Sequence, residues 1–128
     1  MPDVQWSLMC DYCLIDHSGR PSLIGIFDRL GAFSVPVQHP QLFIVTQWSS
    51  QPHQAFKTET RLWTPTEQLL ATTGEVPVAP NPDGRNLTIN QFRAVMLERP
   101  GQYLVELLAE GETARYYPWQ LVVQPGPS

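Results

Sequence analysis

Apolar and polar residues alternate along most of this 128-residue chain. The pattern is clearest over residues 4–15, where the even positions from Val4 to Leu14 are all apolar and the odd positions are mixed. Because successive side chains of a strand point to opposite faces of a sheet, this alternation predicts a strand with one buried face and one partly hydrated face. We expect further strands at residues 41–48, 55–63, 68–76, 86–97, 102–109 and 115–123. A strand is also expected at residues 22–33, which are apolar on both faces at first, as in a strand buried between layers.

The segments between these strands are rich in turn-forming residues, and the chain holds 13 prolines and 8 glycines. No stretch shows the period of an amphipathic helix, so the crossover helices of a βαβ fold are not expected. Short strands separated by turns predict an all-β fold, namely a two-sheet antiparallel β-sandwich of immunoglobulin-like type with about seven to nine strands. The length suits a single domain over residues 1–124, followed by a tail at 125–128.

Charge narrows the classes of partner. Only 16% of the residues are charged, the net charge is -4, and Lys57 is the single lysine. A protein that binds nucleic acid or an anionic membrane needs a basic face, and the scattered arginines predict none. The N-terminus lacks the basic and apolar regions of a signal peptide, and two cysteines do not make a disulfide framework, so we expect a cytoplasmic location.

The pair Cys10 and Cys13 is the first candidate for chemistry, because two cysteines at this spacing with His17 nearby could ligate zinc. Residues three apart on one strand point to opposite faces, however, and no second ligand pair follows. We therefore predict no metal and no cofactor, with one cysteine in the core.

A metal-dependent or hydrolytic enzyme built on Cys10, Asp11, His17 and Asp28 is one functional hypothesis, ranked below the hypotheses of protein binding and carbohydrate binding. Asp11 and Asp28 lie on the first two expected strands and could face each other as a carboxylate pair. No oriented third group accompanies the histidine, as nucleophilic catalysis requires. We predict a protein without enzymatic activity and name no catalytic residue.

The aromatic residues are the stronger candidates for function. Trp6 and Tyr12 fall on the apolar face of the first strand and are expected in the core. Alternation places Trp63 on the same face as three charged side chains, and exposed aromatics can anchor a protein or stack on a sugar. The predicted binding residues are Trp48, Trp63, Tyr117 and Trp119.

Three segments carry a resemblance to an uncharacterised family of small bacterial domains. They are residues 8–11 (LMCD), 21–29 (PSLIGIFDR) and 39–45 (HPQLFIV). Residues 99–103 (RPGQY) also resemble a strand entry that is common in immunoglobulin-like folds. The resemblance implies that fold and supplies no activity, and Cys13 lies outside its pattern.

The leading functional hypothesis is a non-enzymatic module that binds another protein or a second copy of itself. The first alternative is a carbohydrate-binding sandwich that uses Trp48, Trp63 or Trp119 as a stacking platform. The sparse charge and the expected exposure of Trp63, Tyr117 and Trp119 favour the leading hypothesis.

Overall fold

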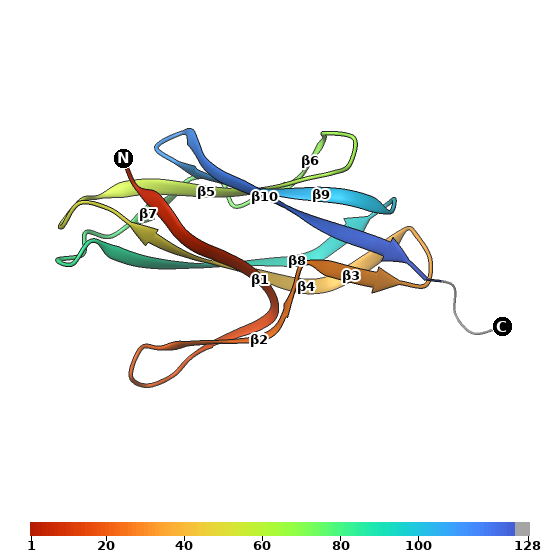
Figure 1. Cartoon of the computed structure of the whole chain (residues 1–128), viewed down its shortest axis with the longest axis horizontal. Coiled ribbons are helices and arrows are strands. Elements are labelled where there is room, and N and C mark those ends of the chain that lie inside the picture. Colours follow the sequence, from red (N-terminus) through yellow and green to blue (C-terminus); the bar gives the residue numbers. More distant parts are fainter. Residues whose placement is uncertain (125–128) are drawn as a thin grey trace.

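The computed structural model describes residues 1–124 and shows two β-sheets packed face to face (Figure 1). One sheet has the order β2-β1-β4-β8, and the other has the order β3-β10-β9-β5-β6 with β7 beside β5. The strands are β1 (Asp3–Ile15), β2 (Pro21–Phe27), β3 (Arg29–Ala32), β4 (Val37–Ser49), β5 (Phe56–Trp63), β6 (Leu69–Thr72), β7 (Val76–Val78), β8 (Arg85–Leu97), β9 (Gly101–Ala109) and β10 (Glu112–Val123). The all-β, two-sheet prediction is confirmed, but the described residues form ten strands rather than seven to nine. The predicted tail at 125–128 lies outside the described residues.

Two of the predicted strands are divided in the structure. The predicted strand 22–33 breaks at Asp28, because β2 pairs antiparallel with β1 in one sheet and β3 pairs parallel with β10 in the other. The predicted strand 68–76 breaks near Gly74, and its two parts, β6 and β7, both pair with β5. Apolar residues resume on the far side of each break because both sheets bury apolar side chains, so the sequence pattern does not reveal a change of strand partner.

The core fills the space between the sheets with aromatic and aliphatic side chains. Trp48 comes from the four-stranded sheet, and Tyr103 and Trp119 come from the six-stranded sheet. The rings of Tyr103 and Trp119 stack with centroids 4.7 Å apart. The Tyr103 hydroxyl donates a hydrogen bond of 2.7 Å to the carbonyl of Arg99, which fixes the turn before β9.

A few polar side chains cross between the sheets. The Tyr117 and Ser7 hydroxyls lie 2.9 Å apart, and Ser7 is also 3.0 Å from the Thr46 hydroxyl. Asn90 on β8 donates to Thr60 on β5. Burial raises the pKa of Tyr117 to about 12. These bonds satisfy polar groups that would otherwise be costly in an apolar interior.

The face of β1 that packs in the core changes along the strand. Val4 lies in the core between the sheets, but the ladder with β4 shifts register after Val4, and Trp6 packs against a second cluster on the outside of the four-stranded sheet. The prediction that Trp6 and Tyr12 belong to the main core is therefore wrong. Tyr12 is 44% exposed and meets Phe43 edge to face on the same outer side.

Candidate functional site

The outer face of the four-stranded sheet carries a continuous set of apolar side chains. Cross-strand partners share a face of a sheet, and the pairings assemble two rows on the outside. One row joins Ile26, Cys10 and Phe43, and the other joins Leu8, Val45 and Ile89. Tyr12 and its partner Ile24 extend the first row towards the hairpin between β1 and β2. We call this surface the apolar face; it comprises Leu8, Cys10, Tyr12, Ile24, Ile26, Phe43, Val45 and Ile89.

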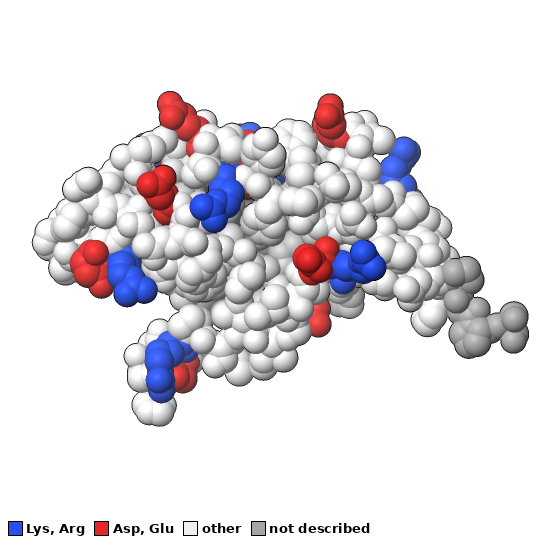
Figure 2. Space-filling view, in the orientation of Figure 1, with Lys and Arg blue, Asp and Glu red and all other residues white. Residues whose placement is uncertain are grey.

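Much of the apolar face is open to solvent. Ile26 is 56% exposed, Ile24 is 53% exposed and Tyr12 is 44% exposed, and Leu8 and Ile89 are each 38% exposed. No position of the two rows carries a charge. The neighbouring charges Asp16 and Arg20 pair with each other in the hairpin turn. Figure 2 shows the surface over β2, near the bottom of the view, as largely white, with charges at the projecting hairpin tip.

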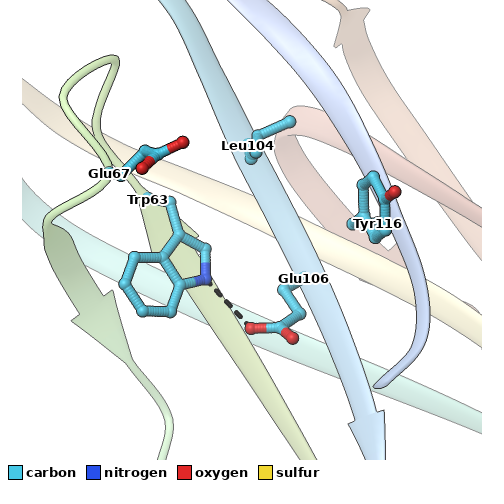
Figure 3. Close-up of a pocket in the computed structure, with 5 residues that line it drawn as sticks. All are labelled: Trp63, Glu67, Leu104, Glu106 and Tyr116. Carbon is cyan, nitrogen blue, oxygen red and sulfur yellow. Dashed lines mark hydrogen bonds between the residues drawn. The ribbon is translucent and has the colours of Figure 1, made fainter.

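The outer face of the six-stranded sheet holds a hollow of about 270 Å³ (Figure 3). Trp63 on β5, Leu104 on β9 and Tyr116 on β10 line it with apolar surface. Glu106 on β9 and Glu67 in the turn after β5 add two carboxylates. Trp63 is partly exposed, and Tyr116 is 66% exposed. Three strands and a turn thus place two aromatic and two acidic side chains around one opening.

A hydrogen-bonded network fixes the acidic side of this hollow. The Trp63 indole N–H donates to Oε1 of Glu106 at 3.0 Å, and Thr113 donates to the other oxygen of that carboxylate. Arg61 lies 3.7 Å from Glu106 but makes its closer contacts, at 2.8 and 3.3 Å, with Glu59. Hydrogen bonds from Arg61 and Thr72 lower the pKa of Glu59, so that carboxylate is ionised at neutral pH.

A second hollow, of about 460 Å³, opens between β7 and β8. Its lining is rich in uncharged hydrogen-bonding groups, among them Thr58, Thr88 and Asn90. Several of these groups are already used within the fold, since Thr88 accepts from the Trp48 indole and Asn90 donates to Thr60. This hollow therefore offers few free hydrogen-bonding groups to a ligand.

The comparison with protein families covers nearly the whole chain. A model of DUF6941, a family of unknown function, matches residues 5–122. This chain belongs to DUF6941. The match agrees with the resemblance to an uncharacterised family that the sequence suggested. No curated protein matches the DUF6941 chain.

Among solved structures, the DUF6941 chain is similar to Pseudomonas fluorescens alkylpurine DNA glycosylase AlkC bound to DNA containing an abasic site analog. The TM-score is 0.56 at 7% sequence identity, and the alignment covers 95% of this chain but only 30% of that one. At this identity the likeness concerns the fold of one part of the larger protein. It carries no activity to the DUF6941 chain.

The structure separates the four predicted binding aromatics of the DUF6941 chain. Trp48 and Trp119 are each 1% exposed and belong to the core, so the expected exposure of Trp119 is wrong and Trp48 is not available for stacking. Both point inward because the second sheet covers their faces, which a single strand's alternation does not reveal. Tyr117 is largely buried against Ser7. Trp63 lies on the outer face, as alternation predicted, and only this residue of the three-tryptophan sugar platform reaches the surface.

Tyr116 and the apolar face were missed by sequence reasoning. Tyr116 alternates with Tyr117 and therefore points outward, a signal that the strand pattern already contained. The apolar face was missed because its residues on β1 look like a core stripe. A β-bulge can move an apolar stripe from the inner face of a sheet to the outer face. The alternation of apolar and polar residues in the sequence is the same in both cases.

The four residues of the enzyme hypothesis differ in their exposure to solvent. Cys10 is fully buried, whereas Asp11, His17 and Asp28 are exposed. Within residues 1–124, no group of three or more His, Cys, Asp or Glu side chains is arranged to hold a metal ion. The same part of the chain contains no helix that is long and apolar enough to cross a membrane.

The prediction that Cys10 and Cys13 face opposite ways is wrong, because both pack against the same outer cluster. The ladder between β1 and β2 passes from the Cys10–Ile26 pair to the Tyr12–Ile24 pair without a regular pair between them. Gly25, at this break, has φ of +69°, so simple alternation fails there. Burial raises the pKa of both thiols, which keeps them protonated and poorly nucleophilic at neutral pH.

Proposed function

We propose that the DUF6941 chain is a non-enzymatic assembly module that binds a second copy of itself through the apolar face. The observation that carries this proposal is the exposure of Ile24 and Ile26 on β2, each more than half open to solvent, on the same face as the exposed apolar residues of β1 and β8. Contiguous exposed apolar patches are uncommon on soluble monomers and mark interaction sites. Burying such side chains contributes about 25 cal/mol for each Å² removed from water.

A second copy fits the apolar face because that face lacks charge. In a two-fold symmetric contact each residue meets the same surface on its partner, so a charged patch would repel its own copy. The rows from Ile26 to Phe43 and from Leu8 to Ile89 place aliphatic and aromatic groups against one another with no ion to desolvate. Arg93, the nearest charge along β8, pairs with Gln41 one step beyond the rows and would remain at the rim.

We expect the contact through the apolar face to be weak. Patches on monomers reach about 300–600 Å², whereas a standard interface buries about 800 Å² on each partner. We therefore expect a dissociation constant in the micromolar range or weaker. This expectation sets the concentrations that an experiment must cover.

Sedimentation equilibrium over about 10 to 500 µM measures the association directly. The wild-type chain is expected to shift from monomer to dimer, and Ile26→Lys is expected to weaken the dimer at least about tenfold, because it places two charges in an apolar contact. Leu69→Lys is the matched control, since Leu69 is 49% exposed on β6 in the other sheet. A wild-type chain that stays monomeric throughout, or equal effects of the two substitutions, would overturn the proposal.

We also propose that the sandwich is immunoglobulin-like. Two observations support this topology. Strands β4 and β8 pair in one sheet while β5, β9 and β10 lie together in the other, as the B–E and C–F–G strands of that fold do. Tyr103, near the start of β9, bonds back to the Arg99 carbonyl in the manner of the tyrosine corner of such domains. An experimental structure with a different strand order would refute this assignment.

A further inference from the structure

We propose that the hollow formed by Trp63, Leu104 and Tyr116 binds an organic cation, with a quaternary ammonium group as its simplest form. This site is on the six-stranded sheet, away from the apolar face, and is independent of the proposed self-association. Such a site requires apolar walls, negative charge at the rim and no lysine or arginine in the lining.

Two of the side chains that line the hollow are aromatic. Trp63 and Tyr116 come from β5 and β10, on either side of the β9 strand that carries Leu104 (Figure 3). A cation over the face of an aromatic ring is attracted by the ring quadrupole, most strongly by tryptophan. The volume of about 270 Å³ is just below the range of drug-sized sites, about 300–1,000 Å³, and suits a compact head group.

The charges around the hollow favour a cation over an anion. Glu67 and Glu106 both line it, and no lysine or arginine is among the lining residues that the structure describes. Arg61 is the neighbouring cation, but its shortest contacts are with Glu59, which leaves the Glu106 carboxylate only partly compensated. A bare anion would meet two carboxylates and gain no donor in return.

The hydrogen bond between Trp63 and Glu106 organises the hollow before any ligand binds. At 3.0 Å the indole N–H holds the carboxylate, and Thr113 holds its second oxygen. Each carboxylate oxygen keeps a further acceptor position. Since the ring and the carboxylate are already fixed, little conformational entropy remains to be lost on binding. A trimethylated lysine side chain on a peptide presents the same cationic group as a free quaternary ammonium ion.

The test is an NMR titration that follows the Trp63 indole N–H signal. Choline is expected to shift this signal with a dissociation constant in the millimolar range or weaker, because each cation–π contact at an exposed site is weak. The neutral analogue 3,3-dimethylbutan-1-ol has the same shape and is expected to cause little shift. A peptide carrying trimethyl-lysine distinguishes a side chain from a free ligand, since it is expected to bind more tightly if the peptide adds contacts.

Substitutions separate binding from folding. Glu106→Gln keeps an acceptor for the Trp63 N–H and is expected to weaken choline binding about three- to tenfold. Tyr116→Ala, at an exposed position, is expected to weaken it to a similar extent. Glu75→Gln makes the same change in charge at an exposed residue outside the hollow and is expected to have no effect.

Three results would overturn this proposal: equal shifts with choline and its neutral analogue, no shift with any cation, or a shift with methyl glucosides in place of choline. The last result would identify a sugar site on Trp63. None of these results bears on the sedimentation experiment, because the two sites lie on different sheets.

Discussion

At the residue scale, Tyr117 couples the stability of the fold to alkaline pH. Burial raises its pKa to about 12, whereas a tyrosine in the unfolded chain ionises near 10. The folded state therefore holds the phenolic proton more tightly, and this contribution is complete below about pH 10 and is lost as the pH rises from about 10 to 12. The shift corresponds to about 3 kcal/mol.

We expect the free energy of unfolding to fall across this window and the fall to be smaller in Tyr117→Phe. Urea unfolding at several alkaline pH values measures both slopes. Tyr103, whose pKa burial also raises, contributes to the fall in both proteins, so the difference between them reports on Tyr117. Identical slopes would contradict the assignment.

Tyr103 provides a second test at this scale. Tyr103→Phe keeps the ring that stacks on Trp119 but removes the hydroxyl that donates to the Arg99 carbonyl. We expect a loss of about 1–2 kcal/mol in the free energy of unfolding, because a part-buried acceptor loses its partner. Tyr116→Phe is the control, since its ring is exposed and we expect less than about 0.5 kcal/mol there. A neutral Tyr103→Phe would show that the bond contributes little.

At the element scale, Gly25 controls the course of the hairpin between β1 and β2. Its φ is +69°, and a Cβ at this position would lie 2.5 Å from a carboxylate oxygen of Asp11. Gly25→Ala therefore combines backbone strain with a clash, and we expect it to destabilise the fold by about 1–3 kcal/mol. Gly19→Ala, at φ of +85° with no heavy atom within 4 Å, carries the strain alone.

Thermal or urea unfolding of both glycine variants isolates the clash as the difference between them. Combining Gly25→Ala with Asp11→Ala is expected to recover that difference while leaving the strain. If Gly25→Ala were no worse than Gly19→Ala, Asp11 would have moved aside at no cost, and close packing of the carboxylate would not be needed for the kink.

At the scale of the whole molecule, the net charge opposes self-association and the apolar face favours it. Each copy carries a charge of -4, so two copies repel at long range, while the apolar face attracts at contact. Salt screens the repulsion, with a Debye length of about 30 Å at 0.01 M and about 8 Å at 0.15 M, but does not weaken apolar burial. We therefore expect self-association to tighten as sodium chloride is raised over this range. Weaker association in salt, measured by sedimentation, would instead indicate a contact made by charges.

The sequence by itself determined the class of fold and most of the strands. Period-two alternation locates strand segments because the pleat of a strand sends successive side chains to opposite faces. It also placed Trp63 on an outer face, and the few scattered basic residues disfavour a basic binding surface. These inferences depend only on local geometry and on composition, and they needed no knowledge of which strands are neighbours.

Only the tertiary structure decided which apolar side chains are buried. Trp119 and Ile26 both lie on predicted strands, but Trp119 is in the core and Ile26 is open to solvent. The sequence of a strand does not show whether a second sheet covers its face. The bulge in β1 after Val4 moved Trp6 and Tyr12 to the outside. Cys13 packs against the same outer cluster as Cys10, next to the irregular pairing of β1 with β2 at Gly25. The apolar face and the Trp63 hollow follow from pairings between strands that are distant in sequence.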